Sequence, residues 1–377
     1  MARIAYVSPL YFADESYIGG GERYPTNLAR GVVLGSGGRH QVDLISFGKV
    51  PGRRPIAPGV DLVVLAATGD PGNPLDILSW DLPAALAGAD LVHIHQAYTR
   101  CTEVGLLIAK QLRKPVCLTD HGGDTSRLGK HYGLPDLADA IVPNSDFAAS
   151  FFGDAKAPIV VIKGGVDTGR FTPSATPVVR SYILYAGRLL PHKGVDRLVR
   201  AIPDDLPLVV CGPAYHRPYE EHVRDLGRGK SVEFRGVVDD ETLLDLYRHA
   251  WANVLPSIHT DCYGNYYAMP ELMGLTLLEA MACGTPAIGS NLAGMPEFIR
   301  HGETGYVFDT PEELRDQVVR LAGEPGLVDR MGRAGRQAVE AEFSLEVAGA
   351  KMAALYDRII ASRSVDAGPG SPIEVAA

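Results

Sequence analysis

Short apolar, β-branched runs alternate along the chain with longer segments in which apolar residues recur at every third or fourth position. The first pattern is typical of buried strands and the second of amphipathic helices. In the first half the strand-like runs are Arg3–Ser8, Val42–Ser46, Leu91–Ile94, Val116–Thr119 and Ala140–Pro143. Helix-like segments between them are Glu22–Leu34 and Val104–Leu112. This rhythm predicts a parallel sheet covered by helices.

The second half repeats the scheme. Its strand-like runs are Tyr182–Ala186, Leu208–Cys211, Val232–Phe234, Ala252–Leu255, Ala287–Gly289 and Gly305–Phe308. The helix-like segments are Val195–Ala201, Tyr219–Leu226, Glu241–Arg248, Leu275–Ala282, Glu312–Leu321, Gly326–Glu340 and Leu345–Ile360. We therefore expect an α/β protein with two doubly wound, Rossmann-like domains.

A proline-containing, small and polar stretch at Thr168–Arg180 has the composition of an interdomain linker. The sequence thus predicts an N-terminal domain over 1–170 and a C-terminal domain over 171–345. A helix over 346–361 is expected to pack back on the N-terminal domain, and the Gly-, Pro- and Ser-rich tail over 362–377 to be disordered. Ligands of open parallel sheets bind at the carboxyl ends of the strands, so we expect the chemistry between the two domains.

Composition excludes several classes of protein. The 377 residues are 46% hydrophobic and 21% charged, as in ordinary globular proteins. A net charge of −9 argues against nonspecific nucleic-acid binding. The first residues do not predict a signal peptide, and no apolar run is long enough to predict a membrane span, so membrane association is possible but not indicated. The five cysteines lack zinc-ligand or CxxC spacing, which predicts no disulfide, no metal site and a cytoplasmic location.

Two segments suit a phosphorylated ligand. Gly19-Gly20-Gly21-Glu22-Arg23 opens a helix, where backbone can approach a ligand and the helix terminus favours negative charge. The chain has neither the GxGxxG of a dinucleotide site nor a GxxxxGK[ST] loop. Arg188 and Lys193 both project from the loop after a predicted strand, and two cations there suit a diphosphate. Alternatively, they are solvated surface cations.

Two glutamates mark a third segment. Glu279 lies in the middle of an apolar helical stretch, where an unpaired carboxylate is unfavourable and a vicinal diol such as ribose would satisfy it. Glu271 lies just before the helix start near Gly274, where it can accept from sugar hydroxyls. Its alternative role is that of an acidic residue favoured by the helix dipole.

These pieces together resemble the retaining glycosyltransferases of family 4, which have the GT-B fold. The segment from Glu271 to Glu279 is similar to the E-x7-E motif of that family, and the resemblance covers nearly the whole chain. The other matching segments, in order, are Gly19–Arg23, Gly164–Asp167 with Phe171–Pro173, Gly187–Gly194, Pro286, Gly294–Glu297 and Gly302–Gly305.

The resemblance implies roles for individual residues. Arg188 and Lys193 would bind the donor diphosphate, Glu279 the ribose and Glu271 the transferred sugar. His121 matches a family histidine that faces the donor sugar, and its alternative role is a strand-end histidine satisfied by backbone. His93 and His95 are interpreted as packing or second-layer residues. Backbone contacts to the donor would come from Gly20, Gly21, Gly236, Val237, Gly274, Leu275 and Thr276.

The chain departs from the family in three places. Leu272 and Met273 stand where the family has Gly or Pro and then an aromatic residue. The loop 258–270 is longer than usual, and its tyrosines, histidine and aspartate either contact donor or acceptor or form a packed surface loop. The family asparagine before Gly165 is replaced by Gly164.

The expected reaction is transfer of a hexose from a nucleoside diphosphate sugar, with UDP the expected nucleotide, to a hydroxyl acceptor. Family resemblance implies retention of configuration, and the C-terminal half has no D-x-D motif beside a strand end, which predicts metal-independent catalysis without a tightly bound cofactor. The alternatives are a sugar-nucleotide epimerase, a sugar phosphorylase, or a non-catalytic sugar-nucleotide-binding subunit.

Overall fold

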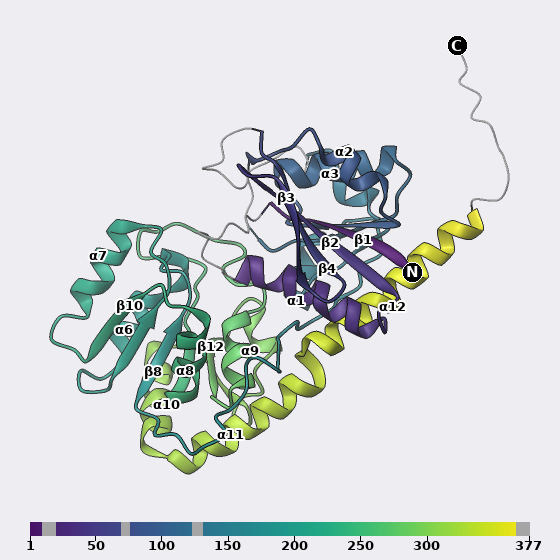
Figure 1. Ribbon diagram of the computed structural model, residues 1–377. Coiled ribbons are helices and arrows are strands. Elements are labelled where there is room, and N and C mark those ends of the chain that lie inside the picture. Colours follow the sequence, from purple (N-terminus) through teal and green to yellow (C-terminus); the bar gives the residue numbers. More distant parts are fainter. Residues whose placement is uncertain (10–19, 69–75, 123–130, 367–377) are drawn as a thin grey trace.

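The computed structural model describes residues 1–9, 20–68, 76–122 and 131–366, with backbone only for 20–22 and 364–366. Two α/β domains lie one above the other in Figure 1, each built on a sheet with helices against its faces. The predicted division into two parallel-sheet domains is confirmed within these residues.

The N-terminal sheet has the strand order β3-β4-β2-β1-β5-β6-β7 among the described residues. All neighbouring strands are parallel except β3 and β4. The strands are β1 Ala2–Val7, β2 His40–Gly48, β3 Gly52–Ala57, β4 Val60–Ala66, β5 Leu91–His95, β6 Val116–Thr119 and β7 Ala140–Ile141. The helices are α1 Gly20–Gly35, α2 Leu82–Ala87, α3 Arg100–Gln111 and α5 Asp146–Ala149, with 3-10 turns at Leu134–Leu137 and Ser150–Phe152.

The C-terminal sheet is parallel throughout its described strands, in the order β10-β9-β8-β11-β12-β13. They are β8 Tyr182–Ala186, β9 Leu208–Cys211, β10 Val232–Gly236, β11 Ala250–Leu255, β12 Ala287–Ser290 and β13 Gly305–Phe308. Its helices are α6 Val195–Ala201, α7 Arg217–Leu226, α8 Asp240–His249, α9 Leu275–Ala282, α10 Pro311–Gly323 and α11 Pro325–Ala338. Short 3-10 turns lie at Pro191–Lys193 and Met295–Glu297, and a π-helical turn at Val339–Phe343 follows α11.

The hairpin of β3 and β4 was not predicted from the sequence, and the last helix extends further than predicted. Strand β3 is exposed over most of its length and contains two arginines and a proline, so it lacks an apolar run. Helix α12, Leu345–Asp366, continues through residues 362–366, which belong to the predicted tail. Residues 367–377 lie outside the described part of the chain.

Helix α12 runs from the C-terminal domain along α1 to the far side of the N-terminal domain (Figure 1). The helices cross closely because glycines meet there: a Cβ on Gly349 would lie 2.0 Å from the carbonyl carbon of Gly31. In the middle of α12, the Tyr356 hydroxyl donates to the Tyr6 hydroxyl on β1 at 2.9 Å. From these contacts we propose that α12 belongs to the N-terminal domain.

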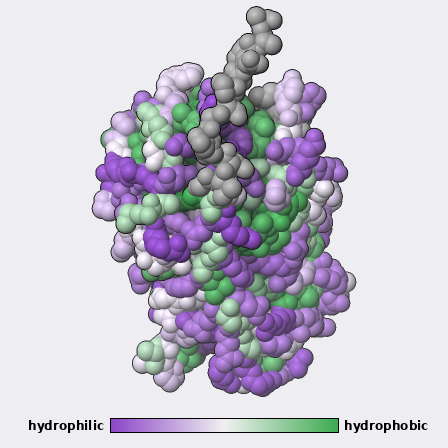
Figure 2. All heavy atoms as spheres, turned by 90° about the vertical axis from the view of Figure 1, so that its right-hand side faces the viewer, coloured by the Kyte–Doolittle hydropathy of each residue, from purple (hydrophilic) through white to green (hydrophobic). Residues whose placement is uncertain are grey.

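Figure 2 shows the side of the molecule that faces right in Figure 1. Hydrophilic residues predominate there, and hydrophobic residues form smaller groups between them. Within the described residues, none of the helices combines the length and the apolar character that crossing a bilayer requires.

Each sheet has a topological switch point, where the order of its strands reverses, and this point lies beside a single strand. Strand β1 lies between β2 and β5, and β8 lies between β9 and β11. Connections leave such a strand to opposite faces, which opens a crevice at its carboxyl end. The loop after β8 is the one that carries Arg188 and Lys193.

Candidate functional site

The loop after β8 brings the two predicted cations to the carboxyl edge of the C-terminal sheet. Arg188 is exposed, whereas Lys193 is only 8% exposed and ends a 3-10 turn. Gly194 then takes φ +66°, and a Cβ there would lie 2.1 Å from the carbonyl oxygen of Pro256. The tight approach requires glycine at this position, and it fixes where Lys193 enters the site.

Lys193 and Glu271 form one ion pair, although sequence analysis assigned them to different parts of the donor. The Lys193 Nζ donates to Glu271 Oε2 at 2.9 Å and to the Pro270 carbonyl oxygen at 2.8 Å. Burial acts to raise the pKa of Glu271, but the Lys193 ammonium and the Gly274 amide outweigh it and hold that pKa below its usual value. Glu271 is therefore an ionised acceptor at neutral pH.

Gly274 starts helix α9 in the left-handed conformation, with φ +80°. Its amide donates to Glu271 Oε1 at 3.0 Å, which ties the glutamate to the helix entrance. Leu275 and Thr276 supply the first amides of α9, and such amides lack an intrahelical acceptor. A phosphate or sugar oxygen placed between these amides and Lys193 would meet donors from both sides.

Glu279 has partners that sequence analysis did not identify. Its side chain is 3% exposed, accepts a hydrogen bond from the Tyr247 hydroxyl at 2.9 Å and lies 3.4 Å from Arg23 Nη1. Arg23 comes from α1 in the other domain and also pairs with Asp240 at 2.6 Å. Burial raises the pKa of Glu279 above its usual value, and Arg23 offsets only part of that rise. Because Tyr247 and Arg23 already partner the buried carboxylate of Glu279, its burial is not by itself evidence for a bound ribose.

His121 follows β6 and is part of a row of histidine rings with His95 and His93 of β5. His95 Nδ1 and His121 Nε2 are 3.0 Å apart, and the two rings are stacked, with centroids at 5.3 Å. The His93 ring stacks on His95, with centroids at 4.2 Å. Burial lowers the pKa of His121 to about 4 and that of His93 to about 3. Both imidazoles are neutral at pH 7, so His121 can exchange a hydrogen bond with a ligand without carrying charge.

The backbone expected to meet the base lies beside a pocket with about 370 Å³ of open space. The pocket is at the carboxyl ends of β8, β9 and β10, and Gly236 has φ +63° there. Its wall is mostly apolar and backbone, with two charged side chains from α7. The lining residues are Leu189, Val210, Gly212, Pro213, Ala214, Glu220, Arg224, Phe234, Gly236 and Val237.

Gly20 and Gly21 are the first residues of α1, and Gly19 lies outside the described residues. The contacts expected for Gly20 and Gly21 therefore stay predictions. Arg23, one turn later, is the residue of this segment that the structure places at the site.

The 258–270 loop is a packed hairpin with a bridge between Thr260 and Tyr266. Asp261 Oδ1 accepts from the amides of Tyr263 and Asn265 at 2.9 Å each. The Ile258 amide donates to the His192 carbonyl oxygen at 2.9 Å, so the hairpin lies directly on the loop that carries Lys193. The loop is therefore packed, and a contact of its exposed Tyr263 and Tyr266 with donor or acceptor stays a prediction.

Leu272 and Met273, which depart from the family pattern, are both buried. A Cβ on Gly122 of the N-terminal domain would lie 3.5 Å from Leu272 Cδ1, an ordinary packing distance. Leu272 therefore takes part in the contact between the domains.

Comparison with known proteins gives two adjacent family matches. Residues 18–170 match "Glycosyltransferase Family 4", and residues 172–338 match "Glycosyl transferases group 1". D-inositol 3-phosphate glycosyltransferase of Streptomyces bingchenggensis is 27% identical, over 93% of this chain and 87% of its own length. A GDP-mannose-dependent alpha-(1-6)-phosphatidylinositol monomannoside mannosyltransferase of Mycobacterium tuberculosis is 33% identical, over 58% of this chain and 62% of its own length.

Two solved structures share the architecture. Sucrose-phosphate synthase of Thermosynechococcus elongatus has a TM-score of 0.73 at 22% identity, covering 96% of this chain and 100% of its own. HepE of Anabaena, in complex with UDP and glucose, has a TM-score of 0.70 at 16% identity, covering 95% of this chain and 100% of its own. These likenesses confirm the predicted fold class, two nucleotide-fold domains that face each other.

Proposed function

The chain belongs to the group 1 glycosyltransferases of family 4, with the GT-B fold, and from this premise we propose that it moves a hexosyl group from a nucleoside diphosphate sugar to a hydroxyl acceptor. We further propose UDP as the nucleotide, retention of anomeric configuration and catalysis without a metal ion. The family matches favour a transferase over an epimerase, a phosphorylase or a non-catalytic subunit.

One observation carries the proposal. Lys193, Glu271 and the entrance of α9 meet within hydrogen-bond distance, at the carboxyl edge of the C-terminal sheet. A cation, a carboxylate and helix amides side by side suit a sugar joined to a diphosphate, because the phosphates need donors and the sugar hydroxyls need an acceptor.

The bond between the anomeric carbon and the diphosphate breaks in this reaction, so negative charge grows on the leaving phosphate. We propose that Arg188, Lys193 and the amides of Leu275 and Thr276 stabilise that charge. Each well-placed donor of this kind is worth about 3–4 kcal/mol in the transition state. The ammonium of Lys193 would shift from Glu271 toward the phosphate when the donor binds.

Glu271 would then be free to accept from hydroxyls of the transferred sugar. It would do so beside the phosphate clamp, the name we give to Arg188, Lys193 and the amides of Leu275 and Thr276. His121 would approach the same sugar from the N-terminal domain as a neutral hydrogen-bond partner. The pocket beside Gly236 and Val237 would take the base. Glu279 would bind the ribose only if the ribose displaces Arg23 from its carboxylate.

The names of the relatives guide the choice of co-substrates. Inositol phosphate acceptors occur in the names of several relatives, and HepE was solved with UDP and glucose. GDP-mannose is a second candidate donor, since it occurs in the name of the mycobacterial relative.

A panel of UDP, GDP and ADP and their hexose derivatives tests the proposal by calorimetry, with and without magnesium. We expect one nucleotide to bind, with an affinity that does not depend on magnesium and that falls in Arg188→Ala. Transfer to inositol phosphates and simple polyols is then measured with the bound donor. Absence of binding by every nucleotide sugar would contradict the donor site.

A further inference from the structure

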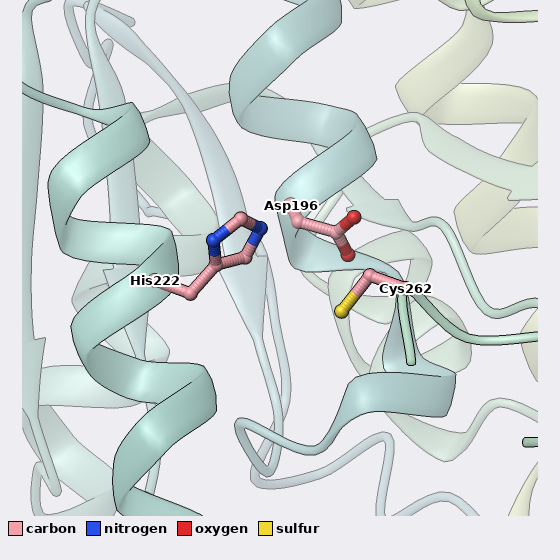
Figure 3. Close-up of side chains that lie close together, drawn as sticks. All are labelled: Asp196, His222 and Cys262. Carbon is pink, nitrogen blue, oxygen red and sulfur yellow. The ribbon is translucent and has the colours of Figure 1, made fainter. Parts of the chain in front are cut away.

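Three potential metal ligands that are far apart in the sequence lie together beside the clamp. Asp196 is in the first turn of α6, His222 is on α7 and Cys262 is in the 258–270 hairpin. One ligand atom from each lies within 4.8 Å of the other two. Figure 3 shows the three side chains close together, with Asp196 between His222 and Cys262. Spacings of 26 and 40 residues hide such a site from motif searches.

We propose that Asp196, His222 and Cys262 bind a divalent transition metal of the zinc class. This inference does not depend on the proposed function. The donor set combines sulfur, nitrogen and oxygen, which suits zinc, whereas magnesium and calcium prefer oxygen alone. Tetrahedral zinc holds its ligand atoms about 3.5 Å apart, so small side-chain rotations close the site.

The surroundings of the three residues support a metal. The Nε2 atom of His222 is buried and has no hydrogen-bond partner among the described residues. Asp196 is 5% exposed, and the Tyr219 hydroxyl donates to its Oδ1 at 2.8 Å. That hydrogen bond orients the carboxylate, as outer-layer partners do for metal ligands. Cys262 is exposed, so an ion can enter from solvent, and a water would complete the coordination.

The metal would fasten the hairpin to the helices next to the clamp. The hairpin touches His192 through the Ile258 amide, and Tyr263 packs against His216 at the start of α7, with ring centroids 5.6 Å apart. A bond to Cys262 would hold this loop to α6 and α7. The role is structural, because the three ligands lie outside the Lys193 and Glu271 pair.

Cobalt substitution tests the site directly. The full chain is stripped with a chelator and titrated with Co²⁺, and we expect one equivalent to give a thiolate-to-cobalt charge-transfer band. Zinc affinity, measured by competition, should fall about a hundredfold or more in Cys262→Ser and in His222→Gln, since even outer-layer changes cost 10–100-fold. His249→Gln, a half-exposed histidine on α8, is the matched control and should leave zinc affinity unchanged.

Thermal unfolding gives a second readout. Zinc should raise the Tm of the wild-type chain by several degrees and leave that of Cys262→Ser unchanged, because only the folded site binds the ion. Cys262 is exposed, so the serine variant should fold, and circular dichroism checks this. No cobalt–thiolate band, or equal zinc affinity in wild type and both ligand variants, would overturn the proposal.

Discussion

Glu271 and Glu279 are eight positions apart at the start and middle of one segment, yet the structure gives them opposite electrostatics. Glu271 is held by a lysine and an amide of its own domain, and its pKa lies below the usual value. Glu279 is more deeply buried, its cation comes from the other domain, and its pKa lies above the usual value. Glu271 therefore has its cation before the domains meet, whereas Glu279 gains its cation only when they are in contact.

The largest effect on the transfer rate is expected at Lys193, the partner of Glu271. Lys193→Ala should lower the transfer rate about a hundredfold or more, because a donor to the leaving phosphate is lost. Arg188→Ala should act in the same direction. Single-turnover assays with the bound donor measure the rates.

Lys230→Ala is the matched control, because Lys230 pairs with Asp204 at the far edge of the same domain. It should keep wild-type activity. Wild-type turnover in Lys193→Ala would show that the ion pair with Glu271 is only structural.

The second effect concerns nucleotide affinity. If the ribose displaces Arg23, Glu279→Ala should weaken binding of the nucleoside diphosphate about tenfold, since a pair of hydrogen bonds to a charged group is lost. Glu271→Ala should change the affinity for the nucleotide alone much less, because its acceptor is the sugar. Calorimetry with the diphosphate and with its sugar separates the two. Equal losses in both variants would contradict the division of roles.

A third effect tests the contact between the domains. Arg23→Ala should lower the free energy of unfolding by roughly 1–3 kcal/mol, because it leaves Glu279 buried without its cation. Combined with Glu279→Gln, the losses should be less than additive by about 1 kcal/mol. Urea unfolding measures the cycle.

Arg30 and Asp167 provide a matched pair for that cycle, at 2.5 Å and closer to solvent. Their coupling should be smaller, because exposed ion pairs contribute about 0–1 kcal/mol. Full additivity at Arg23 and Glu279 would mean that the domains do not rely on this pair.

The smallest effect is a difference in pH dependence. The pKa of Glu271 is lowered from its usual 4.5, so its carboxylate contributes stability that is fully present above that value and is lost as pH falls below it. Glu271→Gln should therefore be more destabilising at about pH 7.5 than at about pH 3. A raised pKa, as at Glu279, works against stability as pH rises, so Glu279→Gln should be relatively more stable at the higher pH. Each pKa unit corresponds to about 1.4 kcal/mol.

Denaturant unfolding of both glutamine variants at the two pH values measures this difference. The sign should reverse between the variants. The same sign in both would contradict the opposite electrostatics of the two glutamates.

The local pattern of the chain was enough for most of the fold. Apolar runs such as Leu208–Cys211 and Leu275–Ala282 appear in the structure with the predicted bounds. A buried strand or helix must carry apolar residues on the face that packs against the core, so the apolar run marks the element. Edge strand β3 lacks an apolar run because an exposed strand has no such requirement, whereas the apolar run of β4 is present in the sequence and was not predicted as a strand. Their place directly after a predicted strand likewise put Arg188 and Lys193 at the carboxyl edge of the sheet.

The sequence by itself determined two parallel-sheet domains and the family, because strand periodicity and ordered motifs are local properties of a chain. Only the tertiary structure decided that Lys193 pairs with Glu271, that Arg23 reaches Glu279 from the other domain, and that Asp196, His222 and Cys262 meet. Each of these contacts joins segments 26 to 256 residues apart. Their partners are set by how helices and loops pack across sheets and domains, and sequence spacing does not record that packing.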